Sequence, residues 1–290
     1  MFVFKAAVVG AGVMGGEIAQ VIAAADIPVL LKDVDQKFVD AGLQKAREVT
    51  EYQQNKLVKR EKITAEQGQA GIDHTLGLIT GTTSYDEFGD VDFVIEAVPE
   101  KMEIKHAVFA ELDAATPGHA ILASNTSGLS ITEIGDATNR PDKVVGFHFF
   151  WPASFMRLIE IIEGEDTSPD TAQAAANFAQ AIKKMPVRCA ECPGFVVNRI
   201  LTSTAAEIWR YQDETGIGAE ELDEHIKQAA GMPMGPFLVA DMSGLDTVVK
   251  VARDMRDAYG DRFYVHRGME ELVARGDLGA KSGKGFYEHS

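Results

Sequence analysis

Short apolar runs and helical patterns follow one another along the first two thirds of the chain. Apolar runs at residues 6–9, 27–31, 91–97, 119–124, 144–150 and 157–162 predict strands. Residues 13–25, 37–57 and 103–112 have helical spacing, and another short helix is expected from Ala65. This order predicts an α/β fold of the Rossmann type, a doubly wound and mainly parallel sheet.

The pattern becomes helical from about Pro186. Segments that begin near residues 193, 220, 245 and 269 have helical spacing, and residues 231–236, read as G-M-P-M-G-P, predict a connecting turn. We therefore expect a first domain of residues 1–188, with a helical insertion near residues 35–72, and an all-helical C-terminal domain of residues 189–290. A length of 290 residues suits two domains.

The first predicted strand leads directly into a glycine-rich turn, V-V-G-A-G-V-M-G, with glycines at Gly10, Gly12 and Gly15. Gly10 permits the tight turn, Gly12 lets the backbone approach a pyrophosphate, and Gly15 lets the helix pack close to the strand. The N–H groups at the start of the helix favour an anion. The motif alone is weak, because turns and packed helices also use glycine for structural reasons.

The second predicted strand is followed by an acidic residue, Asp33, about 20 residues after the turn. A carboxylate at this place accepts hydrogen bonds from the adenosine ribose hydroxyls and repels the 2′-phosphate of NADP. Lys32 is the nearest cation and could weaken that discrimination. The pair of features predicts NAD as cofactor.

Composition limits the classes of partner. A net charge of −16 argues against nucleic acid or an anionic membrane. No apolar run is long enough to cross a membrane, and the first strand follows Met1 closely, so we expect a soluble, cytoplasmic protein without a leader. Cys189 and Cys192 form C-A-E-C with no second pair nearby, so we interpret the spacing as chance and expect no metal.

Two groups of polar residues are candidates for chemistry. Residues 45–62 carry six basic side chains against three acidic ones, a balance of +3, which is either a solvated charged face or a site for a polyanionic substrate. Four polar residues come at or just after the ends of predicted parallel strands, where ligands of doubly wound sheets collect: Glu96, Ser124, Asn125 and Ser127. His148 and Glu160 lie on the next two predicted strands.

Six motifs, in order, resemble the L-3-hydroxyacyl-CoA dehydrogenases over nearly the whole chain: V-V-G-A-G-V-M-G; A-S-N-T-S; G-F-H-F-F-W-P followed by L-I-E-I-I; P-G-F-V-V-N-R; P-M-G-P-F with D-x-x-G-L-D; and K-S-G-K-G-F-Y. The resemblance implies an NAD-binding domain and a helical domain that usually forms a homodimer. It also implies oxidation of the (S)-3-hydroxyl of an acyl-CoA in β-oxidation. The dehydrogenase portion of multifunctional β-oxidation proteins is similar too, so the chain could be such a portion.

Carried over residue by residue, the resemblance implies that His148 is the general base, Glu160 its acidic partner, and Ser127 and Asn198 the polar substrate contacts. It implies cofactor contacts from Gly10, Gly12, Val13, Met14, Gly15, Asp33, Glu100, Lys105, Ser127 and Lys281. Coenzyme A contacts fall on Lys56, Lys105 and Ser127, so the basic segment would meet the phosphates of coenzyme A.

The roles of His148 and Glu160 agree with the chemistry of a dehydrogenase. When hydride leaves carbon 3, the hydroxyl proton must pass to a group that titrates near neutrality, and a neighbouring carboxylate stabilises the imidazolium that forms. One position departs from the family, because Trp151 stands where Asn is common after H-F-F. Either the substrate pocket is reshaped for an unusual acyl group, or turnover is impaired.

Two other functions are also compatible with the sequence. One is a dehydrogenase of a free hydroxy acid or sugar acid, against which the basic segment with Lys56 argues. The other is a catalytically weak NAD-binding protein of the crystallin kind, for which Trp151 is the single supporting feature.

Overall fold

The computed structural model describes residues 2–289 and divides into two compact units, residues 1–192 and 193–290. The first unit is built on an eight-stranded sheet of order β3-β2-β1-β4-β5-β6-β7-β8. Its strands are β1 Ala6–Val9, β2 Val29–Lys32, β3 Ile79–Thr82, β4 Phe93–Glu96, β5 Ile121–Ser124, β6 Val144–Phe149, β7 Leu158–Glu163 and β8 Met185–Ala190. All neighbours pair in parallel except β6 and β7, which are antiparallel. The predicted mainly parallel, doubly wound sheet is confirmed.

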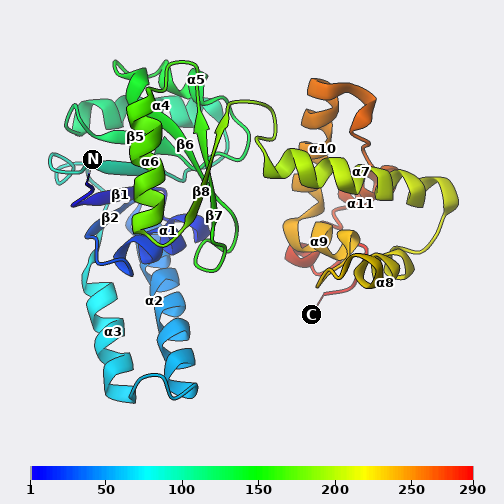
Figure 1. The fold of residues 1–290 in the computed structure, drawn as a ribbon, viewed down its shortest axis with the longest axis horizontal. Coiled ribbons are helices and arrows are strands. Elements are labelled where there is room, and N and C mark those ends of the chain that lie inside the picture. Colours follow the sequence, from blue (N-terminus) through cyan, green and yellow to red (C-terminus); the bar gives the residue numbers. More distant parts are fainter. Residues whose placement is uncertain (1, 290) are drawn as a thin grey trace. The chain divides into compact units, whose positions relative to one another are not determined.

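Helices cover both faces of this sheet (Figure 1). The helices of the unit are α1 Val13–Ala23, α2 Gln36–Lys59, α3 Ala65–Gly77, α4 Met102–Ala115, α5 Ile131–Gly135 and α6 Pro169–Ala181. The core on one face joins α1 and α6 to strand residues such as Ala6 and Val8. Ala7 and Val9 are equally buried and, because strand side chains alternate, they face the other side. A sheet buried on both faces explains why its central strands are continuous apolar runs.

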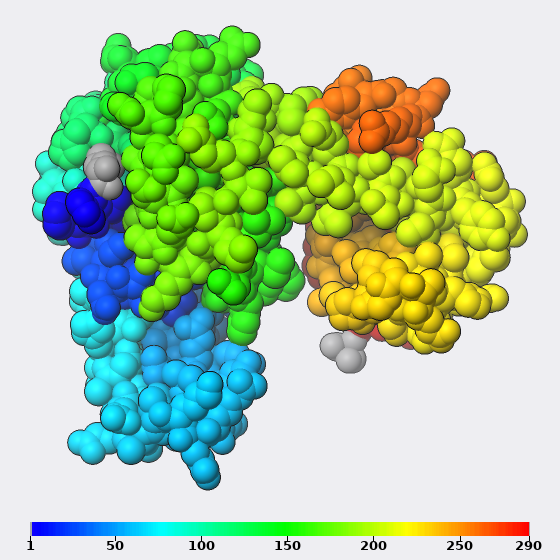
Figure 2. All heavy atoms as spheres, viewed as in Figure 1, coloured from blue at the N-terminus to red at the C-terminus, as the bar shows by residue number. Residues whose placement is uncertain are grey.

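The helices α2 and α3 form a hairpin that projects from the sheet, and Figures 1 and 2 show its far end away from the strands. Asp35 caps the start of α2, and a capping box of Thr64 and Gln67 starts α3. These two helices make up the segment that the sequence predicts as a helical insertion.

The second unit consists of α7 Val197–Thr215, α8 Ala219–Ala230, α9 Pro236–Ser243, α10 Leu245–Tyr259 and α11 Arg267–Arg275. Its core includes Trp209, Phe237 and Leu245. The backbone N–H groups of Phe286 and Tyr287 donate to the buried Asp241 carboxylate at 3.0 and 2.9 Å, which pins the C-terminal segment to α9. A helical C-terminal region is thus confirmed.

The boundary between the units falls after Cys192, whereas the sequence predicts it near residue 188. The reason is β8, which pairs with β7 as far as Ala190 and so belongs to the first unit. Within residues 2–289, no helix is both long and apolar enough to cross a bilayer.

Candidate active site

The glycine-rich turn joins β1 to α1 in the conformation that its glycines predict. Gly10 has φ +100°, and a Cβ there would come within 2.5 Å of the Ala97 carbonyl oxygen. A Cβ on Gly15 would collide with the Gly10 carbonyl oxygen, so only glycine lets α1 pack this close. No atom lies within 4 Å of a Cβ built on Gly12, which is the N-cap of α1 and has no capping side chain. Open space before a helix N-terminus fits a pyrophosphate.

The Asp33 carboxylate is held in place directly after β2. Its Oδ2 accepts a hydrogen bond from the Ala11 N–H and its Oδ1 one from the Val34 N–H, both at 2.7 Å. A pocket beside it is lined by Gly10 and Asp33 and by apolar side chains that include Val98 and Ile104. The Lys32 ammonium lies 4.0 Å from the centre of the Tyr85 ring. An oriented carboxylate beside an apolar pocket fits an adenosine.

Polar residues at or after the carboxyl ends of β4 and β5 meet Lys105 of α4 in a hydrogen-bonded group that we call the rim network. Its six members are Glu96, Glu100, Lys105, Ser124, Thr126 and Ser127. The Lys105 ammonium lies 2.7 and 2.9 Å from the two Glu96 carboxylate oxygens and 3.2 Å from Glu100 Oε2. Ser124 Oγ donates to Glu96 Oε2 at 2.6 Å. Glu100 Oε1 accepts from Thr126 Oγ1 at 2.6 Å and from the Ser127 N–H at 3.0 Å.

One part of the rim network is buried and the other part is exposed to solvent. Glu96, Lys105 and Thr126 are at most 1% exposed, whereas the Glu100 side chain is 40% exposed and Ser127 is at the surface. Burial raises the pKa of the Glu96 carboxyl, and the Lys105 ammonium and the Ser124 hydroxyl oppose that rise by stabilising its charged form.

His148 and Glu160 are brought together by the one antiparallel pairing of the sheet. The register of β6 and β7 places them directly opposite each other, and His148 Nδ1 lies 2.8 Å from Glu160 Oε2. Both are buried, with 5% and 0% exposure. The Asn125 side chain accepts a hydrogen bond from the Phe149 N–H at 2.9 Å, which ties this pair to the end of β5. The two residues are in position for acid–base chemistry.

The loop between β6 and β7 carries Trp151, which is 57% exposed. The buried Lys184 holds this loop, because its ammonium donates hydrogen bonds to the carbonyls of Ala153 and Met156 at 2.5 and 2.7 Å. The buried Glu17 carboxylate accepts from both the N–H and the hydroxyl of Ser154 at 3.0 Å. Burial lowers the pKa of Lys184 to about 8, which the Glu17 charge opposes.

The other predicted residues lie elsewhere. Lys56 is in the last turn of α2, with its ammonium 5.5 Å from the centre of the Tyr52 ring. Asn198 is in the first turn of α7, and Lys281 binds Asp246 Oδ1 at 2.5 Å. Both belong to the second unit, and their place at the rim of the sheet stays a prediction.

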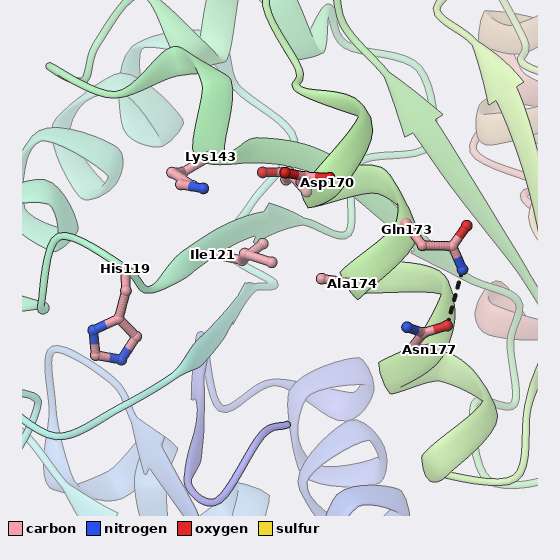
Figure 3. A pocket seen from close by; sticks show the side chains of 8 residues that line it. His119, Ile121, Lys143, Asp170, Gln173, Ala174 and Asn177 are labelled. Carbon is pink, nitrogen blue, oxygen red and sulfur yellow. Dashed lines mark hydrogen bonds between the residues drawn. The ribbon is translucent and has the colours of Figure 1, made fainter. Parts of the chain in front are cut away.

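A second pocket lies at the opposite, amino ends of β5 and β6 (Figure 3). His119 and Lys143, which precede these strands, and Asp170 of α6 line it, together with Gln173 and Asn177. It contains none of the predicted site residues. Within residues 2–289, no group of three or more His, Cys, Asp or Glu side chains is arranged to hold a metal ion.

Several residues of the site escape interpretation from the sequence. Thr126 gives no signal beyond its place in A-S-N-T-S, and Lys184 is separated from the loop it anchors by 28 residues. Glu17 does give a signal in the sequence, since it is a charged residue in the middle of an apolar helix. Such a residue needs a polar partner when it is buried.

Comparisons with known proteins identify the family of the chain. The sequence profile of the "3-hydroxyacyl-CoA dehydrogenase, NAD binding domain" matches residues 5–192, and that of the "3-hydroxyacyl-CoA dehydrogenase, C-terminal domain" matches residues 194–289. The chain is 38% identical to a 3-hydroxybutyryl-CoA dehydrogenase of Clostridioides difficile, over 99% of both. It is also 38% identical to the fatty acid oxidation complex subunit alpha of Psychrobacter sp.. That match covers 98% of this chain but only 38% of the length of the Psychrobacter protein. The crystal structure of (S)-3-hydroxybutyryl-CoA dehydrogenase from Ralstonia eutropha has a TM-score of 0.91 and 36% identity, with full coverage of both chains.

Proposed function

Because this chain belongs to the 3-hydroxyacyl-CoA dehydrogenase family and carries its NAD-binding domain, we propose that it oxidises the (S)-3-hydroxyl group of an acyl-CoA to a 3-oxo group. The observation that carries the proposal is the buried contact of 2.8 Å between His148 Nδ1 and Glu160 Oε2. It joins an imidazole, which can take up a proton, to a carboxylate that stabilises the imidazolium.

His148 takes the proton of the 3-hydroxyl group. With Nδ1 held by Glu160, Nε2 is the nitrogen that accepts it, and Glu160 fixes the orientation of the ring. NAD, when bound, supplies the acceptor for the hydride that leaves carbon 3. Ser127 and Asn198 orient the substrate. One hydride and one proton leave the alcohol, which balances the reaction.

The residues proposed to hold NAD are those of the glycine-rich turn, Asp33 on the adenosine ribose, and Glu100, Lys105, Ser127 and Lys281. The open space over Gly12 and the fixed Asp33 carboxylate support this assignment. Lys56 is proposed to bind a phosphate of coenzyme A.

The experiment that tests the function is NADH formation with a panel of (S)-3-hydroxyacyl-CoAs of increasing chain length, alongside free hydroxy acids and (R)-isomers. We expect turnover with the (S)-acyl-CoAs alone. Turnover only with free acids would support the alternative of a hydroxy-acid or sugar-acid dehydrogenase. NADH binding without turnover of any substrate would support a catalytically weak, crystallin-like protein, for which Trp151 is the supporting feature.

We also propose a homodimer formed through the second unit and a cytoplasmic location. In support of the dimer, α7 exposes Ile200 and Leu201 at 58% each. Exposed apolar side chains mark a protein interface when they form a contiguous patch.

A further inference from the structure

Two exposed aromatic side chains meet between the projecting hairpin and the loop that follows the His148 strand. Tyr52 lies on α2 and Phe155 in the loop between β6 and β7, and their rings pack edge to face with centroids 5.7 Å apart. They are 53% and 52% exposed. We call these two residues the aromatic pair. Its rings offer apolar surface to a ligand, because removing such surface from water is favourable.

The backbone is held on both sides of Phe155. The N–H and the hydroxyl of Ser154 donate to the buried Glu17 carboxylate at 3.0 Å. The carbonyl of Met156 accepts from the Lys184 ammonium at 2.7 Å. A ligand at the aromatic pair therefore meets a surface that is already in place, which lowers the entropy cost of binding.

The aromatic pair lies between the two groups that are proposed to act on opposite ends of the substrate. Lys56 follows Tyr52 by one helical turn, and its ammonium is 5.5 Å from the centre of the Tyr52 ring. Since α2 leads away from the sheet, Tyr52 is on the side of Lys56 that is nearer to the strands (Figure 1). Phe155 belongs to the loop at the end of β6, the strand that carries His148.

We propose that Tyr52 and Phe155 bind the pantetheine arm of the acyl-CoA, with the two methyl groups of its pantoate part packed on the rings. The assignment rests on the proposed function, in which Lys56 binds a phosphate of coenzyme A and His148 acts at carbon 3. The pantetheine arm joins these two parts of the substrate. It is uncharged and carries a branched apolar group, which suits aromatic rings, whereas the phosphates suit a lysine.

The test compares three thioesters of one (S)-3-hydroxyacyl group. They are the CoA thioester, the pantetheine thioester, which lacks the nucleotide, and the N-acetylcysteamine thioester, which also lacks the pantoate part. We expect Tyr52→Ala and Phe155→Ala each to raise KM for the first two by about tenfold, the effect of no longer burying two methyl groups. KM for the third thioester, KM for NAD and kcat should stay near their wild-type values, because the lost contact is remote from carbon 3.

Two control variants accompany the test. Tyr52→Phe keeps the ring and should keep the wild-type KM for all three thioesters. Phe4→Ala removes an aromatic side chain that is 77% exposed but precedes β1, at the opposite edge of the sheet, so it should also change no KM. The pantetheine thioester has no nucleotide phosphate, so a rise of its KM cannot come from a displaced Lys56.

Three results would overturn the assignment. A rise of KM shared by the N-acetylcysteamine thioester would mean that the loop itself has changed, and a rise confined to the CoA thioester would place the aromatic pair against the nucleotide. Wild-type KM for the pantetheine thioester in both alanine variants would remove the pair from the substrate site. If one alanine variant does not fold, the other decides by the same comparison.

A failure of the proposed function would be visible separately, as a wild-type protein that turns over none of the three thioesters. Calorimetric binding of CoA and of adenosine 3′,5′-bisphosphate, which lacks the pantetheine arm, would then decide the assignment. The alanine variants should bind CoA about tenfold more weakly and the bisphosphate as the wild-type protein does. Equal losses for both ligands, or none for CoA, would contradict a contact with the arm.

Discussion

The contact of His148 with Glu160 across the antiparallel strands gives the proposed base a fixed orientation, because strand register and a hydrogen bond both constrain the ring. A pair that shares one proton-transfer step should respond to substitution as a unit. The two side chains are buried in one layer of the sheet, so conservative substitutions are needed to keep the packing.

We expect His148→Gln to lower kcat by about 10²- to 10⁴-fold, the usual contribution of a positioned acid or base. NADH affinity should stay near the wild-type value, because the imidazole is proposed to act on the alcohol and not on the cofactor. Glu160→Gln should lower kcat through the same step, so the double variant should be little slower than His148→Gln alone. Steady-state kinetics of the three variants provide the measurement. Losses that multiply independently would show that the pair has a structural role only.

Asp33 should determine the choice of cofactor. Its carboxylate is held by two backbone N–H groups, and the Lys32 ammonium lies over the Tyr85 ring, so a 2′-phosphate at this place would meet the charge of Asp33. Like charges brought together at a binding site cost several kcal/mol, so kcat/KM for NAD should exceed that for NADP by at least about tenfold. Asp33→Asn should narrow this ratio. Equal kcat/KM values for the two cofactors in the wild-type protein would contradict the assignment.

At the scale of elements, the loop between β6 and β7 depends on an ammonium held away from water. Lys184 faces Glu17, which Lys45 also approaches at 3.5 Å, and its pKa of about 8 lies below the ordinary value of 10.5. Between these two pH values the unfolded chain binds more protons than the folded one at this residue, so the contribution of Lys184 to stability rises with pH.

We therefore expect the melting temperature of the wild-type protein, minus that of Lys184→Met, to increase as the pH rises from about 8 to 10.5. Below pH 8 the difference between them should be constant. Lys183→Met is the matched control, because Lys183 is exposed and precedes Lys184 directly. Thermal unfolding at closely spaced pH values measures both differences in melting temperature. A difference between the wild-type protein and Lys184→Met that does not increase above pH 8 would contradict the lowered pKa of Lys184.

The sequence predicts those elements whose burial leaves a clear pattern. The buried strands β1, β4, β5 and β6 and the helices α1, α2 and α4 lie within two or three residues of their predicted bounds. The short β3 contains two threonines and a glycine, and β8 is an edge strand whose residues are mostly exposed, so neither forms an apolar run. The sequence pattern also does not predict the alanine-rich α6, although Ser168 caps it.

The candidate site shows the same limit at the level of side chains. Strand ends predict which residues share a rim, and the His148–Glu160 contact follows once their strands are neighbours. The supporting contacts of Thr126, Lys105 and Lys184 join residues from separate elements, and no local spacing encodes them. Such contacts come from tertiary packing, which a single sequence does not display.

At the scale of the whole molecule, charge is divided unevenly. The chain has a net charge of −16, yet residues 45–62 carry a balance of +3 on the projecting hairpin of α2 and α3 (Figure 1). An acidic protein repels polyanions in general, so a basic patch at one place selects where a polyanionic substrate can approach. Lys56, in the last turn of α2, is far along this hairpin from the sheet that carries His148.

Binding energy gained so far from the reacting carbon should be the same in the ground state and the transition state, so it should appear in KM and leave kcat unchanged. We expect Lys56→Glu to raise KM for acyl-CoA by about 10- to 100-fold, since a charge-assisted contact is lost and a repulsion is introduced. KM for NAD should remain near its wild-type value. An acyl-pantetheine, which lacks the nucleotide, is the control substrate, and its KM should be the same in the variant and the wild-type protein. An equal rise of KM for both thioesters would place Lys56 away from the phosphates, and an unchanged KM for acyl-CoA would remove it from the substrate site.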